Sequence, residues 1–187
     1  MPISNRALHN VLTLCRLSML AALYVLLNML SIRAGDLRIT FASLPVTVCA
    51  LLFGPGEAAL TALMGEFINQ LTGPYGITAT LPLWLIPPAV RGLVIGGLAL
   101  RARRAGRPLE SRPAALYAVC AAAALATTVC NTGAMLADSL LFRYWFPGYA
   151  LAQLGVRTVT GVLTAVVIAS VAMPLAALLR RQRLVRV

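Results

Sequence analysis

Long apolar runs separated by short polar segments dominate this chain. A helix that crosses a bilayer needs about 20 mainly apolar residues, and four of the runs come close to that length or exceed it. The hydrophobic pattern predicts six helices, at about residues 14–32, 39–53, 57–71, 80–100, 114–141 and 150–179. We therefore expect an all-α polytopic membrane protein: a six-transmembrane-helix bundle that forms a single integral membrane domain over residues 1–187.

The second and third runs are weaker as membrane spans. The second is short and contains Pro45, so we expect this helix to be tilted, kinked or shielded by its neighbours. The third is less apolar because it carries Glu66, Asn69 and Gln70. An even number of spans fits the charge distribution described below, and this supports both helices.

Prolines interrupt the first half of the fourth run, at Pro82, Pro87 and Pro88. Proline in a helix interior leaves the carbonyl four residues earlier without its N–H donor. Since lipid offers no hydrogen bonds, we expect the carbonyls near these prolines to be buried in protein or to face a water-filled cavity.

The composition agrees with a membrane protein. Of the 187 residues, 60% are hydrophobic and 11% are charged, and the mean hydropathy is +0.86. Soluble domains average about 25% charged residues, so this chain has too few charges to cover a globular surface. The net charge is +11, and all sixteen basic residues are arginines.

The arginines are divided unequally between the two sides of a six-span protein. Eleven lie on one side: Arg6, Arg16, Arg101, Arg103, Arg104, Arg107, Arg112, Arg180, Arg181, Arg183 and Arg186. Three lie on the other: Arg33, Arg38 and Arg143. Because cytoplasmic loops are enriched in basic residues, we expect both termini in the cytoplasm.

The residue types present limit the possible chemistry. His9 is the only histidine and there is no lysine, so a serine nucleophile has no obvious base. Cys15, Cys49, Cys120 and Cys130 lie in apolar stretches without CxxC spacing, and we interpret them as packing residues. Phosphate-binding, dinucleotide-binding and nucleic-acid-binding motifs are absent from the sequence. We expect no enzymatic activity, metal site, cofactor or nucleic-acid partner.

Small residues recur four positions apart in the predicted helices, a spacing that lets helix backbones approach closely in lipid. The three clearest stripes are Gly92 and Gly96; Ala118, Ala122 and Ala126; and Gly161, Ala165 and Ala169. We expect most of them to pack inside the bundle. Ser18 and Ala22 on the first helix form a weaker pair, which we assign to a face that docks on a partner.

Polar residues gather at one depth in the predicted helices. In the orientation given above, the third and fifth helices run outward and the fourth and sixth run inward. Toward the outer surface lie Glu66, Asn69, Gln70, Trp84, Asn131, Asp138 and Arg157, with Arg91 near mid-depth. An ionisable group in a span costs about 2.5 kcal/mol or more to insert, so it usually faces a cavity or a partner. Ion pairs that hold the bundle together would explain single residues; for the whole set we favour a pocket open to the outside.

Three motifs in the first half of the chain resemble those of a known family. They are Leu37-Arg-Ile-Thr-Phe-Ala-Ser-Leu-Pro-Val-Thr47, Leu52-Phe-Gly-Pro-Gly56 and Gly65-Glu-Phe-Ile-Asn69. They are similar to motifs of the S components of energy-coupling factor (ECF) vitamin transporters, most of all the folate-type branch. Gly73-Pro-Tyr-Gly76, Pro82-Leu-Trp84 and Arg91-Gly92 fit the same group, and the second half matches in architecture only.

The resemblance implies a high-affinity vitamin-binding membrane subunit in the cell membrane of a bacterium or archaeon. Such subunits capture a vitamin from outside and dock on a transmembrane coupling protein that carries two cytoplasmic ATPase subunits. The binding subunit then topples in the membrane to release its ligand inward. This chain departs from the family in its first helix, which has no clear AxxxA docking motif and offers only Ser18 and Ala22.

The polar residues also suggest a ligand. The candidate substrate-binding residues are Arg38, Glu66, Asn69, Gln70, Tyr75, Trp84, Arg91, Asn131, Asp138 and Arg157. The three arginines can bind carboxylates bidentately. Glu66 or Asp138 can accept hydrogen bonds from an amino-heterocycle on which Trp84 or Tyr75 stacks. Folate combines both features and is our first candidate; pantothenate needs only the arginines, and other vitamins remain open.

Two other classes of protein remain as alternatives. A structural membrane scaffold of the rod-shape, cell-wall type would bind no small molecule and would tolerate changes at Arg91 and Glu66. A membrane enzyme acting on lipid intermediates would show turnover that depends on Glu66 or Asp138, with a metal. Genes for coupling ATPases or for cell-shape proteins beside this one would separate the first two classes.

Overall fold

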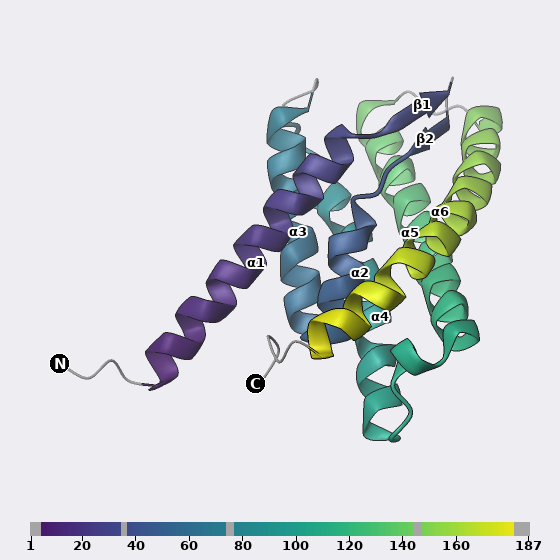
Figure 1. Ribbon diagram of the computed structural model, residues 1–187. Coiled ribbons are helices and arrows are strands. Elements are labelled where there is room, and N and C mark those ends of the chain that lie inside the picture. Colours follow the sequence, from purple (N-terminus) through teal and green to yellow (C-terminus); the bar gives the residue numbers. More distant parts are fainter. Residues whose placement is uncertain (1–4, 35–36, 74–76, 144–146, 182–187) are drawn as a thin grey trace.

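The computed structural model describes residues 5–34, 37–73, 77–143 and 147–181 (Figure 1). Its helices are α1 (Asn5–Met29), α2 (Ser43–Leu52), α3 (Pro55–Thr72), α4 (Leu81–Arg104), α5 (Pro113–Phe142) and α6 (Pro147–Arg181). Six predicted helices and the all-α fold class are thus confirmed. Between α1 and α2, where the sequence suggested only a polar break, β1 (Ile32–Ala34) and β2 (Leu37–Ile39) pair as an antiparallel hairpin.

Among the described residues, four helical segments are long and apolar enough to cross a membrane. They are Asn10–Met29, Leu81–Arg104, Pro113–Phe142 and Ala152–Arg180. The first residues of α1 and the last residues of α6 lie at the same end of the molecule, opposite the hairpin (Figure 1). The arginine-rich loop between α4 and α5 also lies at this end. We therefore call it the arginine end, and we call the opposite end the hairpin end.

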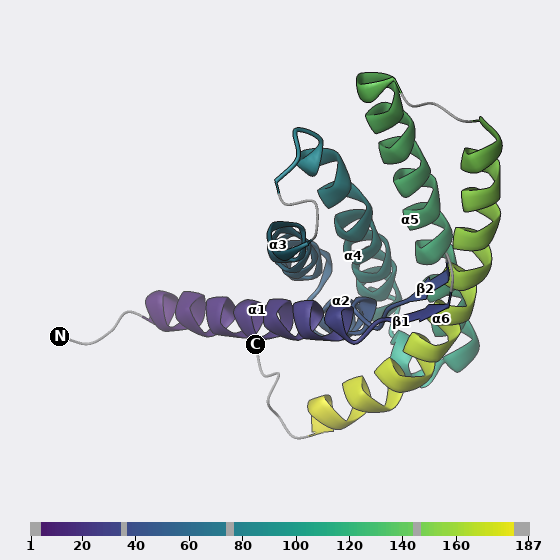
Figure 2. The same cartoon turned by 90° about the horizontal axis from the view of Figure 1, so that it is seen from above.

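Helix α2 is the centre of the bundle. It packs against α1, α3, α4 and α6, and nine of its ten residues are buried. In the view from above, α1 passes along one side of the molecule and α6 curves around another (Figure 2). A helix covered on all sides need not meet the length that lipid demands, which explains why this apolar run is short. The expected shielding by neighbours is therefore confirmed.

The break at Gly54-Pro55-Gly56 separates α2 from α3. Gly54 has φ +122°, a conformation that residues with a Cβ rarely adopt. Pro55 is the first residue of α3, where its missing N–H costs no helical hydrogen bond. The chain therefore reverses direction within a few residues, and α3 returns toward the hairpin end (Figure 1).

The glycine pair on α4 packs directly on α3. A Cβ placed on Gly92 would lie 2.8 Å from the carbonyl carbon and oxygen of Ala58, and one placed on Gly96 would lie 2.7 Å from the nitrogen of Pro55. Both distances are shorter than a real Cβ contact. The two backbones therefore touch, and the prediction that this stripe packs internally is confirmed.

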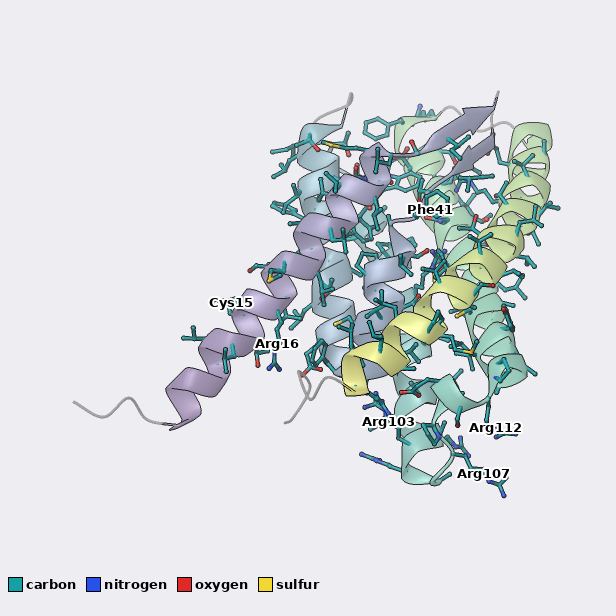
Figure 3. All side chains as sticks on the ribbon, in the orientation of Figure 1. Cys15, Arg16, Phe41, Arg103, Arg107 and Arg112 are labelled. Atoms are coloured by element: carbon teal, nitrogen blue, oxygen red, sulfur yellow. The ribbon has the colours of Figure 1, made fainter. Side chains whose placement is uncertain are left out.

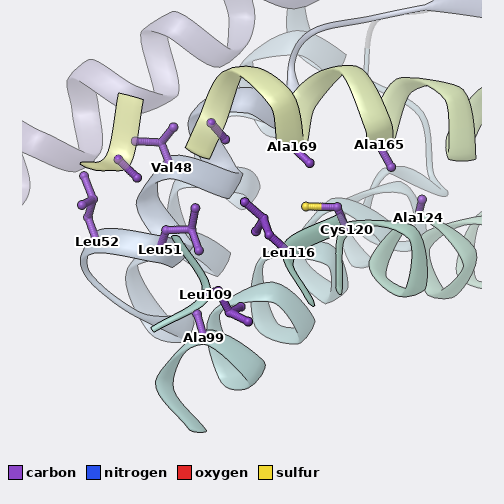
Figure 4. Close-up of a cluster of buried hydrophobic side chains, with 12 residues drawn as sticks. Val48, Leu51, Leu52, Ala99, Leu109, Leu116, Cys120, Ala124, Ala165 and Ala169 are labelled. Carbon is purple, nitrogen blue, oxygen red and sulfur yellow. The ribbon is translucent and has the colours of Figure 1, made fainter. Parts of the chain in front are cut away.

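A buried apolar cluster closes the arginine end of the bundle (Figure 4). Ala165 and Ala169 of α6 face Cys120 and Ala124 of α5 in it, which confirms the predicted stripe on α6. The predicted stripe on α5 is wrong, because Ala118 and Ala122 are exposed while residues two positions further along are buried.

Candidate functional site

A cavity of about 210 Å³ lies toward the hairpin end, between α1, α2, α3, α4 and α5. Five of the predicted site residues line it: Glu66, Asn69, Trp84, Arg91 and Asn131. Five further polar residues line it as well: Tyr24, Asn28, Thr40, Ser43 and Thr127. The sequence separations are large, so the fold of the bundle is what brings these side chains together.

Glu66 is the centre of a hydrogen-bond network between α1 and α3. The Tyr24 hydroxyl donates to Glu66 Oε2 at 2.7 Å, and Gln70 Nε2 donates to Glu66 Oε1 at 2.7 Å. One turn further on, Asn28 Nδ2 donates to Asn69 Oδ1. These bonds fix the carboxylate at the cavity wall, and each oxygen retains lone pairs that can accept further hydrogen bonds.

Close packing of α1 on α3 makes this network possible. A Cβ on Gly65 would lie 2.6 Å from the ring of Tyr24, so only glycine lets the ring reach this position. Tyr24 is 7% exposed and Asn28 is 7% exposed, although both lie on a helix that is otherwise largely open on its outer side. The buried face of α1 therefore serves as a wall of the cavity.

Arg91 stands on the opposite side of the cavity, on α4. Its Nε donates to Thr127 Oγ1 on α5 at 3.1 Å. Within the part of the chain that the structure describes, Arg91 forms no ion pair with a carboxylate. The two terminal guanidinium nitrogens thus remain as donors for a planar acceptor such as a carboxylate, while the bond to Thr127 holds the side chain in place.

A second cavity of about 200 Å³ adjoins the first. The two share four lining residues: Thr40, Arg91, Thr127 and Asn131. The second cavity extends between α5 and α6, where Arg157 and the hydroxyls of Thr128, Thr160 and Thr164 line it. One lobe thus contains a carboxylate and amides, the other contains a guanidinium and hydroxyls, and Arg91 lies between them.

Prolines shape the α4 wall of the first cavity, which Trp84, Pro87 and Pro88 all line. Proline has no N–H, so Pro87 and Pro88 deprive the carbonyls of Leu83 and Trp84 of their donors four residues later in the helix. That these carbonyls face protein or the cavity stays a prediction.

Among the described residues, Gln70 and Asp138 are the predicted site residues that line neither cavity. Gln70 contributes only through its hydrogen bond to Glu66, and Asp138 lies two turns beyond Asn131 on α5. Arg38 is on β2, opposite Arg33 in the hairpin register, and its side chain is outside the described part of the chain. Tyr75 also lies outside the described residues.

The sequence analysis missed Tyr24 and Asn28 on α1, and it also missed Thr40, Ser43 and Thr127. Asn28 was a detectable signal, because an amide within an apolar run must face a partner at that depth. Tyr24, one turn earlier, gave no comparable signal. The predicted docking residues Ser18 and Ala22 lie on the other side of α1 and are exposed.

This arrangement of donors and acceptors suits binding. Among the described residues, no group of three or more histidine, cysteine or acidic side chains could hold a metal ion. The cavities combine a hydrogen-bonded carboxylate, guanidinium groups and an indole, a set of groups suited to a polar molecule that contains a ring.

Comparison with known proteins agrees with this geometry. Residues 12–176 match the model of a family described as ECF transporter, substrate-specific component. None of the curated proteins matches the chain. The family match spans most of the chain, including every helix that lines the cavities. The chain therefore belongs to the family of substrate-specific components of ECF transporters.

Proposed function

We propose that this protein captures a vitamin from the outer side of the cell membrane for ATP-driven uptake, with folate as the first candidate. The observation that carries the proposal is the two-lobed cavity, which has Glu66 on one wall, Arg91 in the middle and Arg157 in the second lobe. An amino-heterocycle would donate hydrogen bonds to Glu66 and stack on Trp84, and a carboxylate would bind Arg91 or Arg157.

Cavity size supports a ligand that uses both lobes. Ligand pockets usually measure about 300–1,000 Å³, and neither lobe reaches that volume alone. A pterin would fit the lobe beside Glu66, and the glutamate tail of folate would extend past Arg91 into the lobe between α5 and α6. A vitamin with a single compact ring would leave the second lobe filled with water.

The proposed partners are a transmembrane coupling protein and two cytoplasmic ATPase subunits. Membership of the family supports association with such a module in the membrane. We assign docking to the exposed side of α1, which includes Ser18 and Ala22. The excess of arginines at the arginine end supports an orientation in which this end and both termini lie in the cytoplasm and the hairpin end lies outside.

Thermal unfolding of the purified protein in detergent tests the proposal. Folate, pantothenate, cobalamin, riboflavin, thiamine and biotin would be added in turn, since a ligand that binds the native state stabilises it in proportion to the logarithm of its concentration over Kd. We expect folate to raise the melting temperature saturably. Arg91→Gln should weaken binding at least tenfold, because a charge-assisted hydrogen bond contributes about 1.5–3 kcal/mol.

Arg143→Gln is the matched control, because it removes the same charge from an exposed residue away from both cavities. Arg157→Gln tests the second lobe: it should weaken binding of folate and leave unchanged the binding of 6-hydroxymethylpterin, which has no carboxylate. No shift with any of the vitamins, in protein that melts cooperatively, would refute the proposal and favour the scaffold alternative.

A further inference from the structure

Residues 101–112, which comprise the last turn of α4 and the loop to α5, form a hook of fixed shape. Helix α4 ends in a Schellman motif in which Gly106, at φ +69°, donates its N–H to the carbonyl of Arg103 at 2.9 Å. Arg107 N donates to the carbonyl of Ala102 at 3.0 Å. The chain then forms a short 3-10 helix, η1 (Leu109–Ser111), whose Leu109 is 4% exposed in the apolar cluster. Both ends of the loop are therefore anchored.

The exposed side of this hook carries positive charge only. Its exposed charged residues are Arg101, Arg104, Arg107 and Arg112. The single acidic residue of the loop, Glu110, has a side chain 6% exposed and pairs with Arg180 at 2.6 Å. Arg107 and Arg112 project away from the bundle at the arginine end (Figure 3).

Two other arginines at this end have a structural role. Arg103 donates to the carbonyls of Leu52 at 3.3 Å and Ala50 at 3.2 Å, and Arg180 donates to the carbonyl of Leu51 at 2.8 Å. They cap the last turn of α2, whose final carbonyls have no helical partner. The four exposed arginines of the hook do not contribute to this cap. Their charge is therefore available to a ligand.

In a bundle whose candidate spans cross the membrane, the four exposed arginines would lie at the depth of lipid headgroups. Candidate spans end at Arg104 and begin at Pro113, so each guanidinium is within one or two turns of an apolar segment. On α4, Leu98 lies one turn before Arg101 and is 39% exposed. An acyl chain on Leu98 would place its phosphate beside Arg101, whereas an acidic protein surface would offer no apolar group to this leucine.

We propose that the exposed arginines of residues 101–112 form a binding site for anionic phospholipids, which they recognise by bidentate hydrogen bonds to the phosphodiester. Orientation in the membrane requires only the number of positive charges near a span. It does not require a loop held by a Schellman motif, a buried leucine and an ion pair. The fixed geometry is therefore explained by a ligand that contacts several guanidinium groups together.

The test compares dioleoyl-phosphatidylglycerol with dioleoyl-phosphatidylcholine. Each lipid is titrated into the full chain in neutral detergent, and native mass spectrometry counts the lipid molecules bound. The wild type should retain phosphatidylglycerol preferentially. In a variant with all four exposed arginines of residues 101–112 changed to glutamine, the preference for phosphatidylglycerol should fall at least tenfold. One arginine near anionic lipid contributes about fivefold to the affinity. Arg143→Gln, at the hairpin end of α5, should keep the wild-type preference.

Three results would overturn the proposal: no lipid preference in the wild type, an unchanged preference in the four-arginine variant, or displacement of the lipid by inorganic phosphate at equal concentration. The last would assign the site to a free anion. If the four-arginine variant melts below the wild type in neutral lipid, Arg107→Gln takes its place, with an expected loss of about fivefold. An unchanged preference in that single variant would also count against the site.

Discussion

Gly96 and Gly97 are neighbours on α4 with opposite surroundings, and together they test how closely α4 packs on α3. A Cβ on Gly96 would overlap backbone atoms of Pro55 and lie 3.0 Å from the carbonyl carbon of Gly54, whereas a Cβ on Gly97 would have no atom within 4 Å. Because the obstructing atoms are backbone, no change of rotamer relieves the overlap. Gly96→Ala must push the start of α3 away from α4.

The pair allows the packing cost to be measured by difference. Alanine gains about 1 kcal/mol over glycine in a helix interior, and both substitutions share this gain. Overpacking costs about 1–3 kcal/mol, and only Gly96→Ala incurs it. The melting temperature of Gly97→Ala should thus be at or above that of the wild type, and that of Gly96→Ala should be below that of Gly97→Ala. In a chain of this size each kcal/mol shifts the melting temperature by about 2–4 °C. Thermal unfolding in neutral detergent measures both, and equal melting temperatures would refute the close approach of the two helices.

Three further predictions concern other contacts, each measured by thermal unfolding in neutral detergent without ligand. Tyr24→Phe should lower the free energy of unfolding by about 1–2 kcal/mol through loss of the bond to Glu66, and a wild-type melting temperature would contradict that bond. Arg103→Ala should destabilise more than Arg104→Ala, since only the former caps α2; equal effects would argue against the cap. Leu109→Ala should cost about 2–5 kcal/mol, and an unchanged melt would show that the loop is not anchored there.

The unequal distribution of arginines supported the two weaker helices, and hydropathy predicted the four long ones because lipid requires long apolar runs wherever a helix crosses it. Hydropathy was less informative for α2, since a helix surrounded by protein is not held to that length. The hairpin was missed because its strands have three residues each, too few to show an alternating pattern. The face of α5 was predicted wrongly because both faces are apolar: Ala118 and Ala122 look as suitable for packing as Cys120 and Ala124.

The candidate site was partly predictable because polar residues within spans must face something other than lipid. This reasoning identified Glu66, Arg91 and Arg157, which do line the cavities. The same reasoning does not predict how far along its helix a polar residue must lie in order to line a cavity. Asp138 is seven residues after Asn131, about 10 Å further along the axis, and so lies beyond both cavities.

The central position of α2 has a consequence for how the protein is made. Ten residues of helix span about 15 Å, roughly half the hydrocarbon thickness, so α2 cannot be inserted by itself as a stable span. During synthesis α2 depends on helices that are translated later and pack against it, namely α3, α4 and α6. Arg180, which caps the end of α2, lies in the last turn of α6. The bundle is therefore completed only when almost the whole chain has been translated, and a protein truncated before Arg180 would be a substrate for membrane quality control.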